Sequence, residues 1–289
     1  LVNMLKWFEE TDMNDTLCVG GKGASLGEMY RNLQDLGVRV PNGFVVTTDA
    51  FNKFFDAEAD PSCWEDVIEP EGLSQIREKA IKCTNLRDAV TQCLTEADAD
   101  NHLEMHGRTA LARSIVLEAQ VPDSVAKTIE DGYRLLCEEY GHGVDVAVRS
   151  SATTEDSDQA SFAGQYESFL NIKGSENVVY HWKRCTASLF TERAVCYQME
   201  KDMNPLESAL AVVVMKMVRS DLSSSGVMFT IDPDSGHTGV IHITSSYGLG
   251  EMIVQGSVSP DGFTIWKEGL NRGKFAIVNR SLGAKERRM

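Results

Sequence analysis

The chain has 289 residues, of which 42% are hydrophobic and 25% charged, as in an ordinary folded protein. Its net charge of −15 argues against nucleic acid as a partner, because a phosphate backbone is bound by clustered lysine and arginine. A nucleotide is compatible with this charge, since a triphosphate needs only a few cations brought together locally. No apolar run is long enough for a membrane helix. Because the first residue is Leu1 and not methionine, we expect a piece of a longer protein.

The cysteine and histidine residues show no pattern of a disulfide framework or a metal site. The six histidines have no mutual spacing typical of metal ligands, and no two cysteines form a C-x-x-C pair. We therefore predict a reduced, cytoplasmic protein in which this chain holds no metal. The scattered cysteines are Cys18, Cys63, Cys83, Cys93, Cys137, Cys185 and Cys196.

The first half of the chain predicts mixed helices and strands. Leu26, Met29 and Leu33 recur at helical spacing, and Gly37 is a natural stop for that helix. The region 56–120 is acidic and mostly helical in pattern, and nothing in it points to chemistry. The elements expected here are helices at 23–36, 49–55 and 122–141 and strands at 44–47 and 144–148.

The second half predicts mainly strands, apart from one long helix at 176–199. Pro205 breaks the chain after that helix, and apolar or alternating runs follow. We therefore predict two lobes, a mixed lobe over 1–203 that contains the helical insert and a strand-rich lobe over 204–289. The expected strands are 166–172, 209–218, 226–231, 240–244 and 262–267.

Glycines surround a lysine at Gly20, Gly21, Lys22 and Gly23, directly before the first predicted helix. Glycine lets the backbone approach an anion closely, and the N–H groups and dipole at a helix start favour a phosphate there. The segment is not a P-loop, because Thr16 stands where that motif has glycine. Its local sequence is equally compatible with a flexible turn that carries a solvated lysine.

Arg149 lies at the end of a predicted buried strand, and a hydroxyl-rich loop begins at Ser150. A guanidinium in that position suits bidentate binding of a phosphate. The alternative is a strand-end arginine paired with Glu155 or Asp156, and the residues alone leave it open.

Two further segments have both a functional and a structural interpretation. Residues 161–165 form either a small-residue loop that closes over a ligand or a tight turn. Residues 215–218 end an apolar strand, which can offer backbone groups to an adenine ring or belong only to the core. Residues 248–250 lack the third glycine of a dinucleotide fingerprint, and residues 232–236 fit a hairpin turn better than a calcium loop.

Taken together, these segments resemble the nucleotide-binding domain of the phosphoenolpyruvate-utilising dikinases. They occur in the family order, cover nearly the whole chain, and are most similar to the phosphoenolpyruvate synthases within that family, with the weakest match at 56–120. The segments are VGGKGASLGEM (19–29), VPNGF (40–44), VAVRSSATTED (146–156), ASFAGQ (160–165), MVRSD (217–221), SGVMFTID (225–232) and YGLGEMIVQGSVSPD (247–261).

The resemblance implies an α/β, ATP-grasp-like fold with ATP in a cleft between two lobes. Lys22 and Arg149 would hold the triphosphate and serve catalysis, and their cationic groups should lie on the order of 10 Å apart across that cleft. Gly164 and Ser168 would line the phosphate and ribose side. Backbone groups of the 215–218 strand would face adenine, chiefly those of Lys216 and Val218. The full expected nucleotide site is Gly20, Gly21, Lys22, Arg149, Ser150, Gly164, Ser168, Met215, Lys216, Met217 and Val218.

The resemblance also implies cofactors and partners. Family members continue into an Asp-x-Glu-Trp strand and a Leu-x-x-Gln-x-Arg-Pro strand, which supply magnesium ligands and another arginine, and then into a phosphohistidine domain and a pyruvate-binding barrel. None of these occurs before Met289. ATP and Mg²⁺ would be the cofactors, and the whole enzyme would convert ATP, pyruvate and water into phosphoenolpyruvate, AMP and phosphate, as in gluconeogenesis.

Three other interpretations stay open at this point. Within the family, the chain could be the nucleotide domain of rifamycin phosphotransferase or of pyruvate, phosphate dikinase, and the domains downstream would discriminate. From another class, it could be a stand-alone ATP-binding module without turnover.

We expect the 289-residue chain by itself to turn over ATP weakly or not at all. The resemblance places the magnesium ligands after Met289, and two side-chain cations do not replace the metal ions that neutralise charge during phosphoryl transfer. A steady-state assay of the purified chain with ATP, magnesium and pyruvate measures this turnover. Rapid formation of phosphoenolpyruvate would contradict the expectation.

Overall fold

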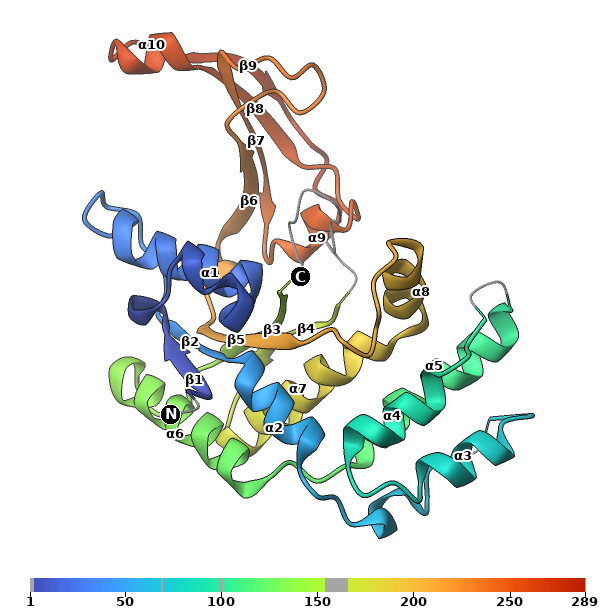
Figure 1. Ribbon diagram of the computed structural model, residues 1–289. Helices are drawn as coiled ribbons and strands as arrows, with labels where there is room; N and C mark the ends of the chain where they lie inside the picture. Colours follow the sequence, from blue (N-terminus) through green and yellow to red (C-terminus); the bar gives the residue numbers. More distant parts are fainter. Residues whose placement is uncertain (1–2, 69, 99–100, 154–165, 289) are drawn as a thin grey trace. The chain divides into compact units, whose positions relative to one another are not determined.

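The computed structural model describes residues 3–68, 70–98, 101–153 and 166–288, which fall into two units (Figure 1). Unit 1 is Leu1–Met217 and unit 2 is Val218–Met289. Each unit combines helices with an antiparallel sheet, so the α/β class expected from the sequence is confirmed. The units divide after Met217 and not at 203/204, because strand β5 (Leu210–Lys216) pairs with two strands of the first sheet.

A five-stranded antiparallel sheet forms the centre of unit 1, in the order β1-β2-β5-β3-β4. The middle strand, β5, is buried from Leu210 to Val214 because both faces of the sheet are covered. Its apolar run therefore has the pattern of a fully enclosed strand rather than an alternating one. The other strands are β1 (Leu5–Trp7), β2 (Gly43–Val46), β3 (Val146–Ala152) and β4 (Ser168–Ile172).

A thick helical layer covers one face of this sheet, and it holds the main hydrophobic core (Figure 1). Phe44, Val148 and Val214 enter this core from the sheet, and Phe51 and Trp182 enter it from helices. The region 56–120 contributes three helices to the layer, as its pattern predicts. The helices are α2 (Thr48–Asp56), α3 (Ser74–Ala80), α4 (Leu86–Leu94), α5 (His102–Glu118), α6 (Asp123–Tyr140), α7 (Ser175–Ala187) and α8 (Glu192–Glu200).

The single long helix expected at 176–199 is wrong, because the chain breaks it into α7 and α8. A 3₁₀ turn at Ser188–Phe190 separates the two helices and buries Leu189 and Phe190 in the core. Thr191 then begins α8 as its N-cap, since its side-chain oxygen accepts the N–H of Ala194. The polar and apolar spacing continues across the turn, so the sequence pattern did not reveal the break.

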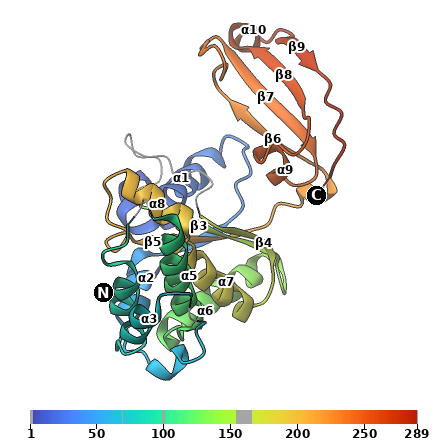
Figure 2. The ribbon, with the colours of Figure 1, turned by 90° about the vertical axis from the view of Figure 1, so that its right-hand side faces the viewer.

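Helix α1 (Thr16–Leu33) lies on the opposite face of the sheet, as Figures 1 and 2 both show. A second, smaller core lies between them, where Val19 and Ala24 of the helix meet Val45, Ala211 and Val213 of the sheet. These side chains are small, so the helix can approach the strands closely.

Unit 2 is built on a four-stranded antiparallel sheet in the order β6-β7-β8-β9. The segment 232–236 is a hairpin turn between β6 and β7, in which the N–H of Gly236 donates to the carbonyl of Asp232 at 2.8 Å. Within the described ranges, no helix combines the length and apolarity needed to cross a membrane. The elements are β6 (Ser224–Phe229), β7 (Val240–Tyr247), α9 (Glu251–Val254), β8 (Asp261–Trp266), α10 (Lys267–Asn271) and β9 (Ile277–Ser281).

Helix α1 is kinked at Gly20, where the chain touches strand β3. Gly20 has φ 72 and ψ 170, so regular helix starts again only after it. A Cβ atom added at Gly20 would lie 2.1 Å from the carbonyl oxygen of Ser151. Only glycine satisfies both the positive φ and this close approach.

We expect Gly20→Ala to destabilise the protein more than Gly37→Ala. Both glycines have positive φ, but nothing lies within 4 Å of a Cβ added at Gly37. The control substitution should lower the free energy of unfolding by about 1–2 kcal/mol from backbone strain, and Gly20→Ala by roughly a further 1–3 kcal/mol from overpacking. Denaturant unfolding of both variants measures the difference, and equal losses would show that the contact with Ser151 has little weight.

Candidate functional site

Lys22 extends from α1 onto strand β3. Its Nζ donates a hydrogen bond to the main-chain carbonyl of Ser150 at 3.1 Å. Ser150 follows Arg149 directly, so the ammonium group lies beside the strand position that carries the guanidinium. Two cations that are far apart in sequence are therefore brought together in unit 1.

Ser151 fastens the glycine loop to β3. Its fully buried hydroxyl donates to the carbonyl of Val19 at 2.8 Å and accepts the N–H of Gly23 at 3.0 Å. Gly20 and Gly21 are buried beside this contact. The helix that restarts after Gly20 thus has its N-terminal end at β3. The partial positive charge of such an end favours a bound anion.

Arg149 lies on the same face of β3 as Ser151, because alternate residues of a strand share a face. In the sheet register it stands directly opposite Ser168 of β4. Among the described residues the guanidinium of Arg149 makes no ion pair or hydrogen bond. The alternative partners Glu155 and Asp156 lie outside the described residues. The helix end, the lysine and the arginine consequently converge on one face of the sheet.

The expected adenine strand ends close to this group. Met215 faces the same side of the sheet as Arg149, and the register makes them diagonal neighbours, roughly 7–8 Å apart. The N–H of Lys216 donates to the carbonyl of Asn42 at 3.1 Å, and its Nζ lies 5.2 Å from the ring centre of Tyr140 on the other side. Lys216 therefore has its N–H and its side chain committed within the protein.

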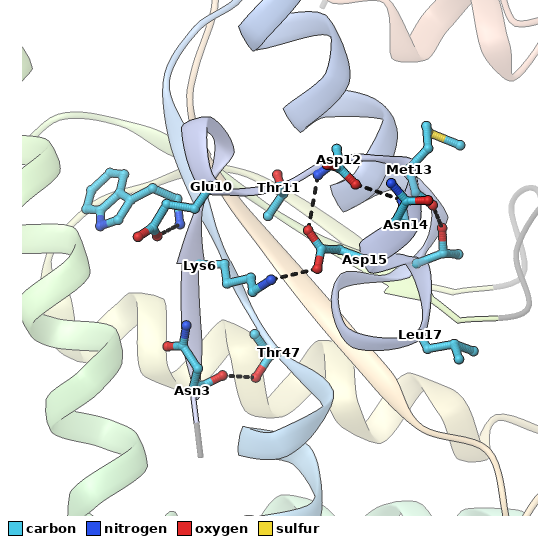
Figure 3. Close-up of polar contacts among 12 residues, drawn as sticks. Asn3, Lys6, Glu10, Thr11, Asp12, Met13, Asn14, Asp15, Leu17 and Thr47 are labelled. Carbon is cyan, nitrogen blue, oxygen red and sulfur yellow. Dashed lines mark hydrogen bonds and ion pairs between the residues drawn. The ribbon is translucent and has the colours of Figure 1, made fainter. Parts of the chain in front are cut away.

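A polar network holds the start of α1 in front of the glycine loop (Figure 3). Lys6 Nζ of β1 lies 2.6 Å from a carboxylate oxygen of Asp15, and this hydrogen bond raises the pKa of the lysine above its usual range. The other Asp15 oxygen accepts the N–H of Asp12 at 3.2 Å, and Asp12 in turn accepts the N–H of Asn14 at 2.8 Å. The first turn before Gly20 is thereby tied to the edge of the sheet.

Three of the expected site residues, Ser150, Gly164 and Val218, need separate comment. The Ser150 hydroxyl donates to the carbonyl of Glu167 at 3.1 Å on the helical side, so Ser150 faces the site with its carbonyl. Gly164 lies outside the described residues, and Val218 is the first residue of unit 2. Sequence reasoning did not single out Ser151, although it lies within the same short motif.

No magnesium site is found in the described part of the chain, where no group of three or more His, Cys, Asp or Glu side chains could hold a metal ion. Magnesium prefers several oxygen ligands, above all carboxylates, and the residues around Lys22 and Arg149 do not offer such a set. All seven cysteines are free thiols. The ammonium of Lys22, the guanidinium of Arg149 and the N-terminal end of the helix after Gly20 are groups of the kind that bind an anion.

Comparisons with known proteins identify the family that the chain resembles. The family model described as "Pyruvate phosphate dikinase, AMP/ATP-binding domain" matches residues 16–289. Phosphoenolpyruvate synthase of Aquifex aeolicus is 40% identical over 287 residues, which are 99% of this chain and 30% of that protein. The synthases of Escherichia coli (40% identical, 99% of this chain) and Deinococcus radiodurans (42%, 100%) are matched over 33% of their length. The chain thus spans about a third of these relatives.

Proposed function

The chain belongs to the AMP/ATP-binding domain family of pyruvate phosphate dikinase, and from this membership we propose that it binds ATP for a phosphoenolpyruvate synthase. In the whole enzyme, ATP, pyruvate and water would give phosphoenolpyruvate, AMP and phosphate through a phosphohistidine outside this chain. The phosphohistidine domain and the pyruvate-binding barrel would be its partners. Free cysteines are compatible with the reducing cytoplasm, where we place this step of gluconeogenesis.

The observation that carries the proposal is the contact of Lys22 with Ser150 beside Arg149. A triphosphate is stabilised by cations and N–H groups that are already in position, because little further reorganisation is then needed. The lysine serves as a point charge and the arginine as a planar fork, so the two would grip different phosphate oxygens. Ser168, opposite Arg149, would line the same side.

Adenine would lie along the end of β5. The N–H of Lys216 is engaged by Asn42, so the carbonyl of Lys216 is the group that we propose for the adenine amino group. Met215 would contact the ring from the face that it shares with Arg149. If main-chain atoms recognise adenine, a change of side chain at these positions has little effect on binding.

Magnesium would enter with the nucleotide and neutralise phosphate charge, and we propose that its ligands come from other parts of the enzyme. The part played by the chain itself is to bind and orient the triphosphate. Lys22 is held by Ser150, and the helix end after Gly20 is held by Ser151. Such fixed positioning is the main contribution a protein makes to phosphoryl transfer.

We expect Lys22→Ala and Arg149→Ala each to weaken ATP binding by about 1–3 kcal/mol, the value of a charge-assisted hydrogen bond. Arg149→Lys should also weaken binding, because an ammonium cannot reproduce a bidentate fork. Calorimetric titration of the chain with ATP measures these losses.

Two exposed cations provide matched controls. Lys53→Ala on α2 and Arg39→Ala should bind ATP like the unmodified chain, since neither residue belongs to the group around β3. If the Lys22 and Arg149 variants bind as these controls do, the phosphate assignment is refuted. Circular dichroism of each variant separates lost binding from lost folding.

A further inference from the structure

One ion pair joins the helical insert, residues 56–120, to the start of strand β4, which pairs with the strand that carries Arg149. Arg113 of α5 lies 2.5 Å, through a terminal guanidinium nitrogen, from Oε1 of Glu167. Glu167 immediately precedes β4, and Arg113 belongs to the region 56–120, in which the sequence reveals no chemistry. The contact spans two parts of the chain that no local pattern connects.

The main chain of Glu167 is a junction for hydrogen bonds. Its N–H donates to the hydroxyl of Ser188 at 3.2 Å. Its carbonyl accepts from the N–H of Ser150 at 3.4 Å and from the Ser150 hydroxyl at 3.1 Å. The thiol of Cys185 approaches the same carbonyl at 3.7 Å. The position of Glu167 therefore governs the position of Ser150.

Ser150 passes this constraint to the site on the other face of the sheet. Its carbonyl is the acceptor for Lys22 Nζ, and its neighbour Arg149 stands opposite Ser168, the residue after Glu167. A displacement of Glu167 would move both the acceptor of Lys22 and the strand that faces Arg149.

The pair is not built for maximal stability. Arg113 Nε and Glu167 Oε2 are buried and have no hydrogen-bond partner among the described residues, so only half of a bidentate fork is used. A partly buried, incompletely satisfied ion pair contributes little or even opposes folding, and an apolar replacement of both partners is often neutral or better. Its geometry is better explained by the placement of Glu167.

We propose that Arg113 and Glu167 are positioning residues of the nucleotide site, which hold Ser150 so that Lys22 and Arg149 meet the phosphates of ATP. The proposal rests on the ATP-binding function proposed above. Neither residue touches the nucleotide. They act from the helical side of the sheet, through the main chain of β3 and β4.

The test compares stability with ATP affinity in Arg113→Met, in Glu167→Leu and in the double variant. Each single variant leaves one uncompensated charge and should unfold at a lower denaturant concentration, whereas the double variant should regain most of that stability. We expect the dissociation constant for ATP to rise about tenfold in all three variants, including the double variant. Arg87→Met is the matched control, because it removes another ion pair of the helical insert, with Asp56 at 2.5 Å, and should bind ATP normally.

A purely structural pair would give a different result. If the double variant regains both stability and normal ATP affinity, or if the single variants bind ATP normally, the positioning role is overturned. Lys22→Ala, measured beside them, separates this proposal from the proposed function. Loss of ATP affinity in Lys22→Ala alone overturns only the role of Arg113 and Glu167, whereas an unmodified chain that does not bind ATP overturns both.

Discussion

The close approach of α1 to β3 at Gly20 is the constraint on which the site depends. A side chain at this position would occupy the space of the Ser151 carbonyl, so the helix could not come near the strand. Because it does, the hydroxyl of Ser151 bonds both Val19 and Gly23, and the lysine next to the loop reaches the carbonyl of Ser150. The small side chains of Ala211 and Val213 extend the same close contact along the sheet.

Neighbouring residues of β3 point to opposite faces of the sheet and therefore make different contacts. Arg149 and Ser151 face α1 and the cationic group, whereas Val148 and Ser150 face the helical layer. Ser150 serves both sides, since its side chain bonds Glu167 below the sheet and its carbonyl receives Lys22 above it. A strand that carries a ligand group on one face can thus be set in place by the core on the other.

The sequence predicts the fold class and most elements of this chain, because glycine stops, apolar periods and strand alternation are local signals. Among the motif segments that carry the resemblance, the glycine segment around Lys22 lies against Ser150 and Ser151 of β3. The break at Ser188–Phe190 is not predicted, because the apolar spacing continues through it. The boundary between the units is placed too early, because the chain after Pro205 still adds strand β5 to the sheet of unit 1. The pair of Arg113 and Glu167 was not predictable, since it depends on how α5 packs and carries no motif.

Local charge, rather than the net charge of −15, decides whether a triphosphate can bind. At physiological salt, screening limits the reach of an exposed charge to about 8 Å, so only charges close to a bound phosphate affect its binding. Glu167 lies close to Lys22 and Arg149, because its carbonyl accepts the hydroxyl of Ser150. Burial raises the pKa of the Cys185 thiol beside it, and the negative charge of Glu167 raises that pKa further. The guanidinium of Arg113 pairs with the carboxylate of Glu167 and offsets its charge, whereas Lys22, Arg149 and the helix end contribute positive charge on the α1 face.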